Sequence, residues 1–214
     1  MQYGEDGPPR PLERAPKVDF CLTRLPNLRV LKLYFCRPHD VTAILLALSS
    51  SPAVQTLEAI EYSNLGAPSD ADFDADFTVL AHFKGLRELS LKCFVHSVCE
   101  LLPQLPQLTT LRVEDGKSVS RAPLCSASLK QLFVREACES LLPYIVSLAT
   151  LEEGLQSLQV VELDRADFDA GSSQTMTYIA SMCARLPQLS VLVLHPMGSF
   201  HTFLRLCELM PSLG

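Results

Sequence analysis

The chain has 214 residues, and 48% of them are hydrophobic, which is enough for a folded core. Its formal net charge is -6 and its pI is about 5.4, so its surface should repel phosphate backbones and no nucleic acid is expected as partner. The longest apolar run, near 41–48, is too short to cross a bilayer, and the polar residues 1–10 do not resemble a signal peptide. We therefore expect a cytoplasmic or nuclear chain with no membrane partner.

The cysteine count is even, which allows a disulfide framework, but the expected compartment favours reduced thiols. Most of the cysteines lie inside apolar segments, where a free thiol packs as a small hydrophobic group. The eight are Cys21, Cys36, Cys93, Cys99, Cys125, Cys138, Cys183 and Cys207. No N-x-[ST] glycosylation site occurs, which agrees with the same compartment.

One pattern, L-x-x-L-x-L, recurs along nearly the whole chain. Clear copies begin at Leu28, Leu86, Leu108, Leu129, Leu158 and Leu189, a weaker one at Val54, and a copy cut short at Leu213. These first anchors are separated by 26, 32, 22, 21, 29, 31 and 24 residues. Two units are long, and each carries an insertion, near 70–76 and 171–174 respectively.

The last two anchors of each copy alternate along the chain, as on one side of a short β-strand. A single such strand cannot bury its apolar side, whereas successive units stacked in parallel share a continuous core. The returning segment of the first unit places Val41, Ile44, Leu45 and Leu48 on one helical face, with Asp40 expected as its N-cap.

Later return segments show the same helical spacing. They are represented by Phe77, Leu80 and Ala81; Val98, Leu101 and Leu102; Leu141, Leu142, Ile145 and Leu148; Ile179, Met182 and Cys183; and Phe203, Leu204 and Cys207. The fourth unit is short, and residues 121–123 predict a loop instead.

These units resemble leucine-rich repeats of the irregular kind, and are most similar to the arrays of F-box substrate receptors in ubiquitin ligases. The resemblance implies an α/β leucine-rich-repeat solenoid, curved, with parallel strands on the concave face and helices on the convex face. In that family Asn or Cys often lies five residues after the second leucine, and Cys36 occupies that position here.

The domain organisation follows from the extent of the repeats. We expect residues 1–20 to be an N-terminal tail or partial cap and residues 21–214 to form one repeat domain of about seven units and a truncated eighth. Because the last unit stops in mid-motif, we expect the chain to be a fragment of a longer protein. The oligomeric state is left open.

Residues between the inward anchors should form two columns on the concave face. The first column is Lys32, Glu58, Ser90, Arg112, Phe133, Glu162 and Val193. The second column is Tyr34, Ile60, Lys92, Glu114, Arg135, Asp164 and His195. From these columns we predict partner-binding residues Lys32, Tyr34, Ile60, Lys92, Arg112, Glu114, Phe133, Arg135, Glu162, Asp164 and His195.

No catalytic or metal site is expected. Cys93, His96 and Cys99 have zinc-like spacing but lack an evident fourth ligand, and Gly116-Lys-Ser lacks the earlier glycine of a phosphate loop. The acidic stretch 70–76 fits no calcium-loop register. The five histidines are scattered over different units.

We therefore predict a non-enzymatic module without cofactors that recognises a protein or peptide through its concave face. By resemblance it would serve substrate recognition in a ubiquitin ligase. The alternative is the regulatory repeat domain of an immune-type sensor or a GTPase activator. An unrecognised metal-dependent enzyme is the third hypothesis, and stoichiometric zinc in the purified protein would reveal it.

Overall fold

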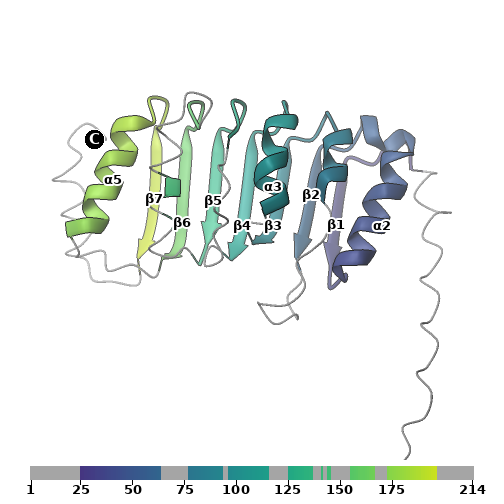
Figure 1. The fold of residues 1–214 in the computed structure, drawn as a ribbon, viewed down its shortest axis with the longest axis horizontal. Coiled ribbons are helices and arrows are strands. Elements are labelled where there is room, and N and C mark those ends of the chain that lie inside the picture. Colours follow the sequence, from purple (N-terminus) through teal and green to yellow (C-terminus); the bar gives the residue numbers. More distant parts are fainter. Residues whose placement is uncertain are drawn as a thin grey trace, which may run out of the picture.

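The computed structural model describes residues 25–63, 77–93, 96–115, 125–136, 141, 144–145, 155–166 and 173–196. These residues form a seven-stranded sheet in which every strand is parallel to its neighbours and strand order follows the sequence (Figure 1). The strands are β1 (Val30–Tyr34), β2 (Ala59–Ser63), β3 (Glu88–Cys93), β4 (Thr110–Asp115), β5 (Gln131–Arg135), β6 (Val160–Ala166) and β7 (Val191–Pro196). The predicted α/β class with a parallel sheet is confirmed.

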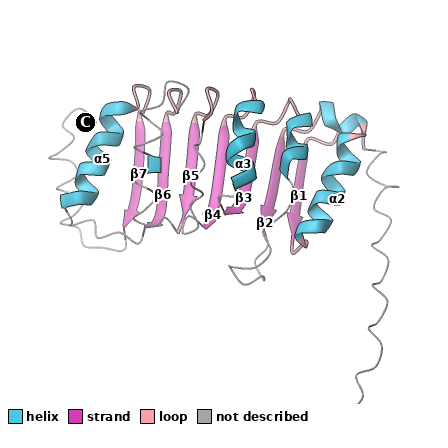
Figure 2. Ribbon diagram, in the orientation of Figure 1, coloured by secondary structure: helices cyan, strands magenta, loops and turns pink. Residues whose placement is uncertain are grey.

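The helical segments lie together on one face of this sheet (Figure 2). They are the α-helices α2 (Pro38–Ser49), α3 (His96–Leu101) and α5 (Ser173–Arg185), and the 3₁₀ segments η1 (Pro52–Gln55), η2 (Phe77–His82) and η3 (Leu102–Gln104). Parallel neighbours require such crossovers, because after each strand the chain must return to the end of the sheet at which all strands begin.

A repeated hydrogen bond sets the start of every strand. The Arg29 carbonyl accepts the N–H groups of both Glu58 and Ala59, at 2.8 and 3.0 Å. The same double acceptance joins each later pair of neighbouring strands, and the accepting carbonyls are those of Glu58, Arg87, Thr109, Lys130 and Gln159. All six strand pairs therefore start in the same register, and β6 and β7 then shift register between Leu163 and Ala166.

A tight turn precedes most strands. The Leu28 N–H donates to the Leu25 carbonyl at 3.2 Å, and the same bond three residues back recurs before β3, β4, β6 and β7. Pro26, Pro106 and Pro187 lie second in their turns, where a φ fixed near −65° suits the geometry. The sequence Leu-Pro-x-Leu therefore forms a turn that lies directly before a strand.

The predicted anchors form one apolar core between the sheet and the helices. Leu89, Leu111, Leu132 and Val161 are the second anchors of four neighbouring strands, and each is at most 1% exposed. From α2, Val41, Leu45 and Leu48 are fully buried in the same core. The helical face predicted for the first return segment is thus confirmed.

The second unit was assigned to the wrong register. Strand β2 pairs Leu31 with Ile60 and Leu33 with Tyr62, so its anchors are Leu57, Ile60 and Tyr62. Ile60 and Tyr62 are each 2% exposed, so Ile60 is a core residue and not a binding residue. The anchors of the first three units are consequently 29 residues apart, instead of 26 and 32.

The error has a physical origin. Tyr62 fills an anchor position normally taken by an aliphatic residue. Its hydroxyl is satisfied by donating to the Cys36 carbonyl at 3.3 Å. Its ring lies 6.1 Å from that of Phe77. Because tyrosine breaks the L-x-x-L-x-L pattern at position 62, the sequence pattern favours Val54 as first anchor in place of Leu57.

The start of α2 also differs from the prediction. The helix begins at Pro38 with Arg37 as N-cap, so Asp40 lies inside the first turn and is not the cap. Proline suits the first helical position because its missing N–H would have no partner there. The carboxylate of Asp40 still lies at the positive end of the helix.

Most described parts of the other return segments agree with the predicted packing. Val98, Leu101 and Leu102 are buried from α3 and η3, and Ile179 and Met182 from α5. Leu141 and Ile145 are buried as well. The segment at 77–82 is a 3₁₀ helix instead of an α-helix, although Phe77 and Leu80 are still buried.

Several predictions lie outside the described residues. They concern the tail 1–20, the insertion 70–76, residues 116–118 and 121–123, and the chain beyond 196, including the truncated unit. Within the described part, no helix has the length and apolar character needed to span a bilayer. Cys36, Cys99, Cys125 and Cys183 form no disulfide bond within that part.

Replacing Leu111 with alanine should lower the free energy of unfolding by about 2–5 kcal/mol, because it empties a fully buried position at the centre of the sheet. Urea denaturation followed by circular dichroism measures the change. Leu46→Ala on α2, where the side chain is 51% exposed, is the control and should stay within about 0.5 kcal/mol. Equal losses for both variants would contradict the core assignment.

Two residues that directly follow strands have left-handed backbone conformations. Phe35 follows β1 with φ 58°, and Glu136 follows β5 with φ 53°; they occupy equivalent positions in their units. Non-glycine residues rarely adopt this region, and asparagine tolerates it better than phenylalanine. The turn after the strand therefore stores some backbone strain.

Phe35→Asn should raise the free energy of unfolding by up to about 1 kcal/mol, since the phenylalanine ring is 70% exposed and the backbone strain falls. Phe35→Ala is the matched control, because alanine removes the ring but keeps the unfavourable conformation. The difference between the two variants, measured by urea denaturation, isolates the strain. Identical stabilities would show that the conformation costs nothing.

Candidate partner-binding face

The sheet has one face free of the described helices, and we call it the open face. Its side chains alternate with the core anchors along each strand. The first column consists of Lys32, Glu61, Ser90, Arg112, Phe133, Glu162 and Val193. The second column consists of Tyr34, Ser63, Lys92, Glu114, Arg135 and Asp164, with the backbone of His195 continuing it in β7. A hollow of about 740 Å³ runs across strands β1 to β6 of this face.

Most of the predicted binding residues are brought together there. Those lining the hollow are Lys32, Arg112, Glu114, Phe133, Arg135, Glu162 and Asp164. Tyr34 and Lys92 lie at second-column positions of the same face. Ile60 belongs to the core, as described above, and the His195 side chain lies outside the described residues.

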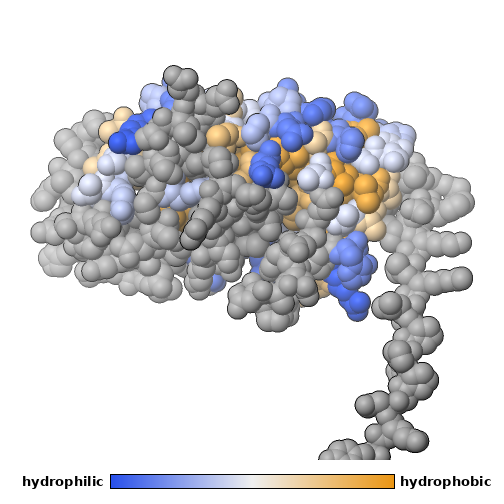
Figure 3. Space-filling view, viewed as in Figure 1, coloured by the Kyte–Doolittle hydropathy of each residue, from blue (hydrophilic) through white to orange (hydrophobic). Residues whose placement is uncertain are grey.

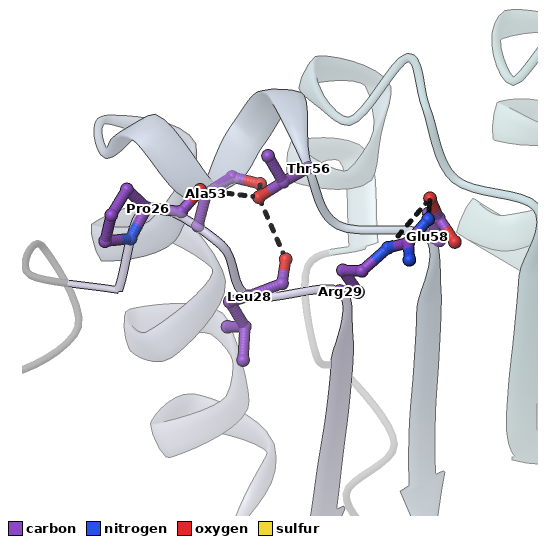
Figure 4. Close-up of polar contacts among 6 residues, drawn as sticks. All are labelled: Pro26, Leu28, Arg29, Ala53, Thr56 and Glu58. Atoms are coloured by element: carbon purple, nitrogen blue, oxygen red, sulfur yellow. Dashed lines mark hydrogen bonds and ion pairs between the residues drawn. The ribbon is translucent and has the colours of Figure 1, made fainter.

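Sequence reasoning missed two residues and misplaced two others. Glu61 and Ser63 occupy the face positions of β2, where Glu58 and Ile60 had been expected. Glu58 lies before β2, where its carboxylate accepts from Arg29 at 2.6 Å (Figure 4). Equal 29-residue spacing of the first three units is the signal that could have corrected the register.

The starts of β1 and β2 are also joined by a hydroxyl. The Thr56 hydroxyl lies 3.0 Å from the carbonyls of both Pro26 and Leu28 (Figure 4). These carbonyls belong to the preceding unit, so Thr56 ties the turn before β1 to the turn before β2. The contact fixes where the first two strands of the open face begin.

At one end of the face, three side chains form a network. The Lys32 ammonium lies 2.7 Å from Glu61, and the Tyr34 hydroxyl donates to the same carboxylate at 2.6 Å. The hydrogen bond from Lys32, followed by that from Tyr34, holds the pKa of Glu61 below its ordinary value of 4.5. The same bonds to Glu61 raise the pKa of Lys32 and of Tyr34.

Glu61→Gln should destabilise the protein more at pH 7 than at pH 3. Because the folded-state pKa of Glu61 is depressed, its contribution is present above about pH 4.5 and is lost as the pH falls through the folded-state value. Urea denaturation at both pH values, in low salt, measures the difference.

Glu88→Gln is the control for this prediction, since Glu88 lies on the neighbouring strand and makes no ion pair with any described residue. An effect of Glu61→Gln that is the same at pH 3 and pH 7 would show that the network adds no charge-dependent stability.

The centre of the face holds a stacked arginine. The guanidinium carbon of Arg112 lies 4.0 Å from the centroid of the Phe133 ring on the next strand. Such a contact is favourable because the negative face of the ring attracts the cation. Arg112 remains exposed and Phe133 is half-buried, so this pair is open to a ligand.

Other charges on the face are partly matched. Arg135 lies 3.9 Å from Asp164 on the next strand, a loose and exposed pair. Ser63 donates to Glu114 at 2.8 Å across the intervening strand. The face is therefore polar and charged around the stacked Arg112–Phe133 pair.

The predicted chemistry of the cysteines can be followed in part. Cys99 of the zinc-like motif is 1% exposed in the core, with its sulfur 3.9 Å from the Tyr144 hydroxyl, while the side chains of Cys93 and His96 lie outside the described residues. Among the described side chains, no three potential ligands are grouped to hold a metal ion. Cys36 donates to the Tyr34 carbonyl at 3.5 Å, in the turn after β1.

The opposite side of the molecule differs in character. Figure 3 shows apolar side chains reaching the surface near α2 and α3, among blue hydrophilic residues. Leu46 of α2 is the large hydrophobic residue most exposed on a described helix. The helical side around Leu46 can therefore serve as a control surface when partner binding to the open face is tested.

Comparison with models of known protein families found no match. A search of curated proteins also found none.

Proposed function

We propose that the chain is a leucine-rich-repeat recognition module that binds a protein partner through the open face of its sheet. The stacked Arg112–Phe133 pair at the centre of the hollow is the observation that carries this proposal. Arginine and aromatic residues dominate the binding energy of many protein interfaces.

The repeat assignment is supported by the uniform hydrogen bonding of the strands. With the corrected register, successive first anchors are 29, 29, 22, 21, 29 and 31 residues apart. Leucine-rich repeats are typically about 20–29 residues long, with one strand per unit. Each described unit likewise contributes one strand and joins only its neighbours in the sheet.

Binding is favoured over catalysis by the state of the side chains. On the open face, the described charges are stacked on a ring, hydrogen-bonded or paired across strands. Burial raises the pKa of the thiols of Cys36 and Cys183 above 9.0, so neither provides the thiolate that a cysteine nucleophile needs at neutral pH.

The resemblance to F-box substrate receptors extends the proposal. In that setting the open face would hold the substrate of a ubiquitin ligase, and the ligase components would join through other parts of the protein. A partner that is not linked to ubiquitin ligation would leave the recognition role intact and remove this extension.

The test compares partners captured by the wild-type chain with those captured by Tyr34→Ala, Arg112→Ala, Phe133→Ala, Arg135→Ala combined. The tagged proteins are purified from cells that express the chain, and bound proteins are identified by mass spectrometry. We expect the combined variant to lose at least one specific partner by about tenfold or more, because its central contacts are removed.

A matched variant on the helical side serves as control. It combines Leu46→Ala, Gln104→Ala, Thr177→Ala and Arg185→Ala, four exposed positions away from the open face. Circular dichroism must show that both variants are folded. If the control loses the partners and the open-face variant keeps them, binding takes place on the helical side and the proposal fails.

A further inference from the structure

The guanidinium of Arg112 is held in place by a ring but is not hydrogen-bonded to any described residue. Its guanidinium is held 4.0 Å from the Phe133 centroid, and it makes no hydrogen bond or ion pair with any described residue. No described residue occupies the donors around its edge, while the ring restricts its position. A guanidinium held in this way loses little entropy when it binds a carboxylate.

The open face carries charges of both signs. The open face and the starts of its strands carry seven basic residues, namely Arg29, Lys32, Arg87, Lys92, Arg112, Lys130 and Arg135. They carry six acidic residues, namely Glu58, Glu61, Glu88, Glu114, Glu162 and Asp164. The hollow itself is lined by four of these basic residues and by all six acidic ones, so an acidic ligand is favoured only beside a cation that lacks a partner.

Several of the acidic groups are already engaged. Glu58 accepts from Arg29, Glu61 from Lys32 and Tyr34, and Glu114 from Ser63. Arg112 is thus a cation in the hollow with no carboxylate within ion-pair distance among the described residues, although Glu61 lies near enough for the arginine charge to help lower the pKa of that carboxylate. An arriving acidic group would meet it without first breaking an ion pair.

We propose that Arg112, stacked on Phe133, anchors the partner by binding the carboxylate of an aspartate or glutamate in an exposed segment of that partner. This inference rests on the proposed function and names the chemistry that the open face recognises. The planar guanidinium offers two parallel N–H donors, which match the two oxygens of a carboxylate.

A carboxylate fits this position better than a phosphate. A phosphate group carries nearly two negative charges at neutral pH, and it would be placed close to Glu114 on the same strand and to Glu61. A single carboxylate charge suits a single arginine between acidic neighbours. Phosphate recognition is therefore the competing outcome of the test.

The experiment selects binders from a phage-displayed library of random twelve-residue peptides on the immobilised wild-type chain. We expect the selected peptides to share an aspartate or glutamate at one aligned position. One such peptide is then synthesised with Asp, with Asn and with phosphoserine at that position, and its affinity is measured by fluorescence anisotropy.

Arg112→Ala should weaken binding of the Asp peptide by at least about tenfold, and Asp→Asn in the peptide should weaken binding to the wild-type chain by a similar factor. The two changes together should cost little more than either alone, because both remove the same contact. Arg185→Ala on α5 removes an exposed arginine elsewhere and should leave the affinity unchanged.

Phe133→Leu provides a second arm, in which Arg112 stays but its stacking partner is lost. We expect an intermediate loss of affinity, with the preference for Asp over Asn retained.

Two effects that simply multiply would overturn the inference, as would tighter binding of the phosphoserine peptide or selected peptides without a shared acid. In those cases the proposed function stands, provided that the combined open-face variant still loses the peptides. If that variant binds them as the wild-type chain does, or if no peptide is selected, the proposed function itself is contradicted together with this inference.

Discussion

The backbone carbonyl that precedes each strand is the constraint on which the structure depends. In every neighbouring pair it accepts two consecutive N–H groups of the next unit, at 2.7 to 3.0 Å. Buried and edge backbone groups need partners, and this arrangement supplies them in the same way at each step. Because the starts of all seven strands are fixed by it, the core anchors fall into rows on one side of the sheet. The remaining side chains fall into columns on the other side.

Side-chain hydroxyls strengthen this arrangement at several steps. Thr109 donates to the Arg87 carbonyl at 3.3 Å, and Ser190 donates to the Gln159 carbonyl at 3.2 Å. Ser128 reaches the Leu105 carbonyl at 3.3 Å. Threonine and serine close to the first anchor thus bond the preceding unit. Cys36 donates to the Tyr34 carbonyl in the turn after β1, at the position where leucine-rich repeats often carry asparagine or cysteine.

The periodic part of the fold could be predicted from sequence, because apolar spacing determines which side of a strand is buried. The anchors Leu111, Leu132 and Val161 and the helical face of α2 were identified in this way. The register of β2 could not, since Tyr62 combines a buried ring with a bonded hydroxyl. The start of α2 was missed because Pro38 competes with Asp40 as a signal for the first turn.

Part of the candidate site could also be predicted from the sequence. Alternation placed Lys32, Arg112 and Phe133 on one face, but it says nothing about which side chains pair across strands. The stacking of Arg112 on Phe133 and the sharing of Glu61 by Lys32 and Tyr34 depend on side-chain geometry between residues that are 21 to 29 positions apart in the chain. Two of the contributing positions, Glu61 and Ser63, became visible only with the corrected register.

The unequal length of the units has a consequence for how such a protein changes over evolutionary time. Lengthening a whole unit from 21 to 31 residues raises the entropy cost of closing the loop by only about 0.3 kcal/mol. Insertions on the helical side are therefore tolerated while the strands keep their alignment. A lineage can vary a first-column or second-column residue independently of the core and test a new partner one substitution at a time. Because unit length matters so little, whole units can also be duplicated or lost. The number of strands in the open face then changes, while the alternation of core and face residues stays the same.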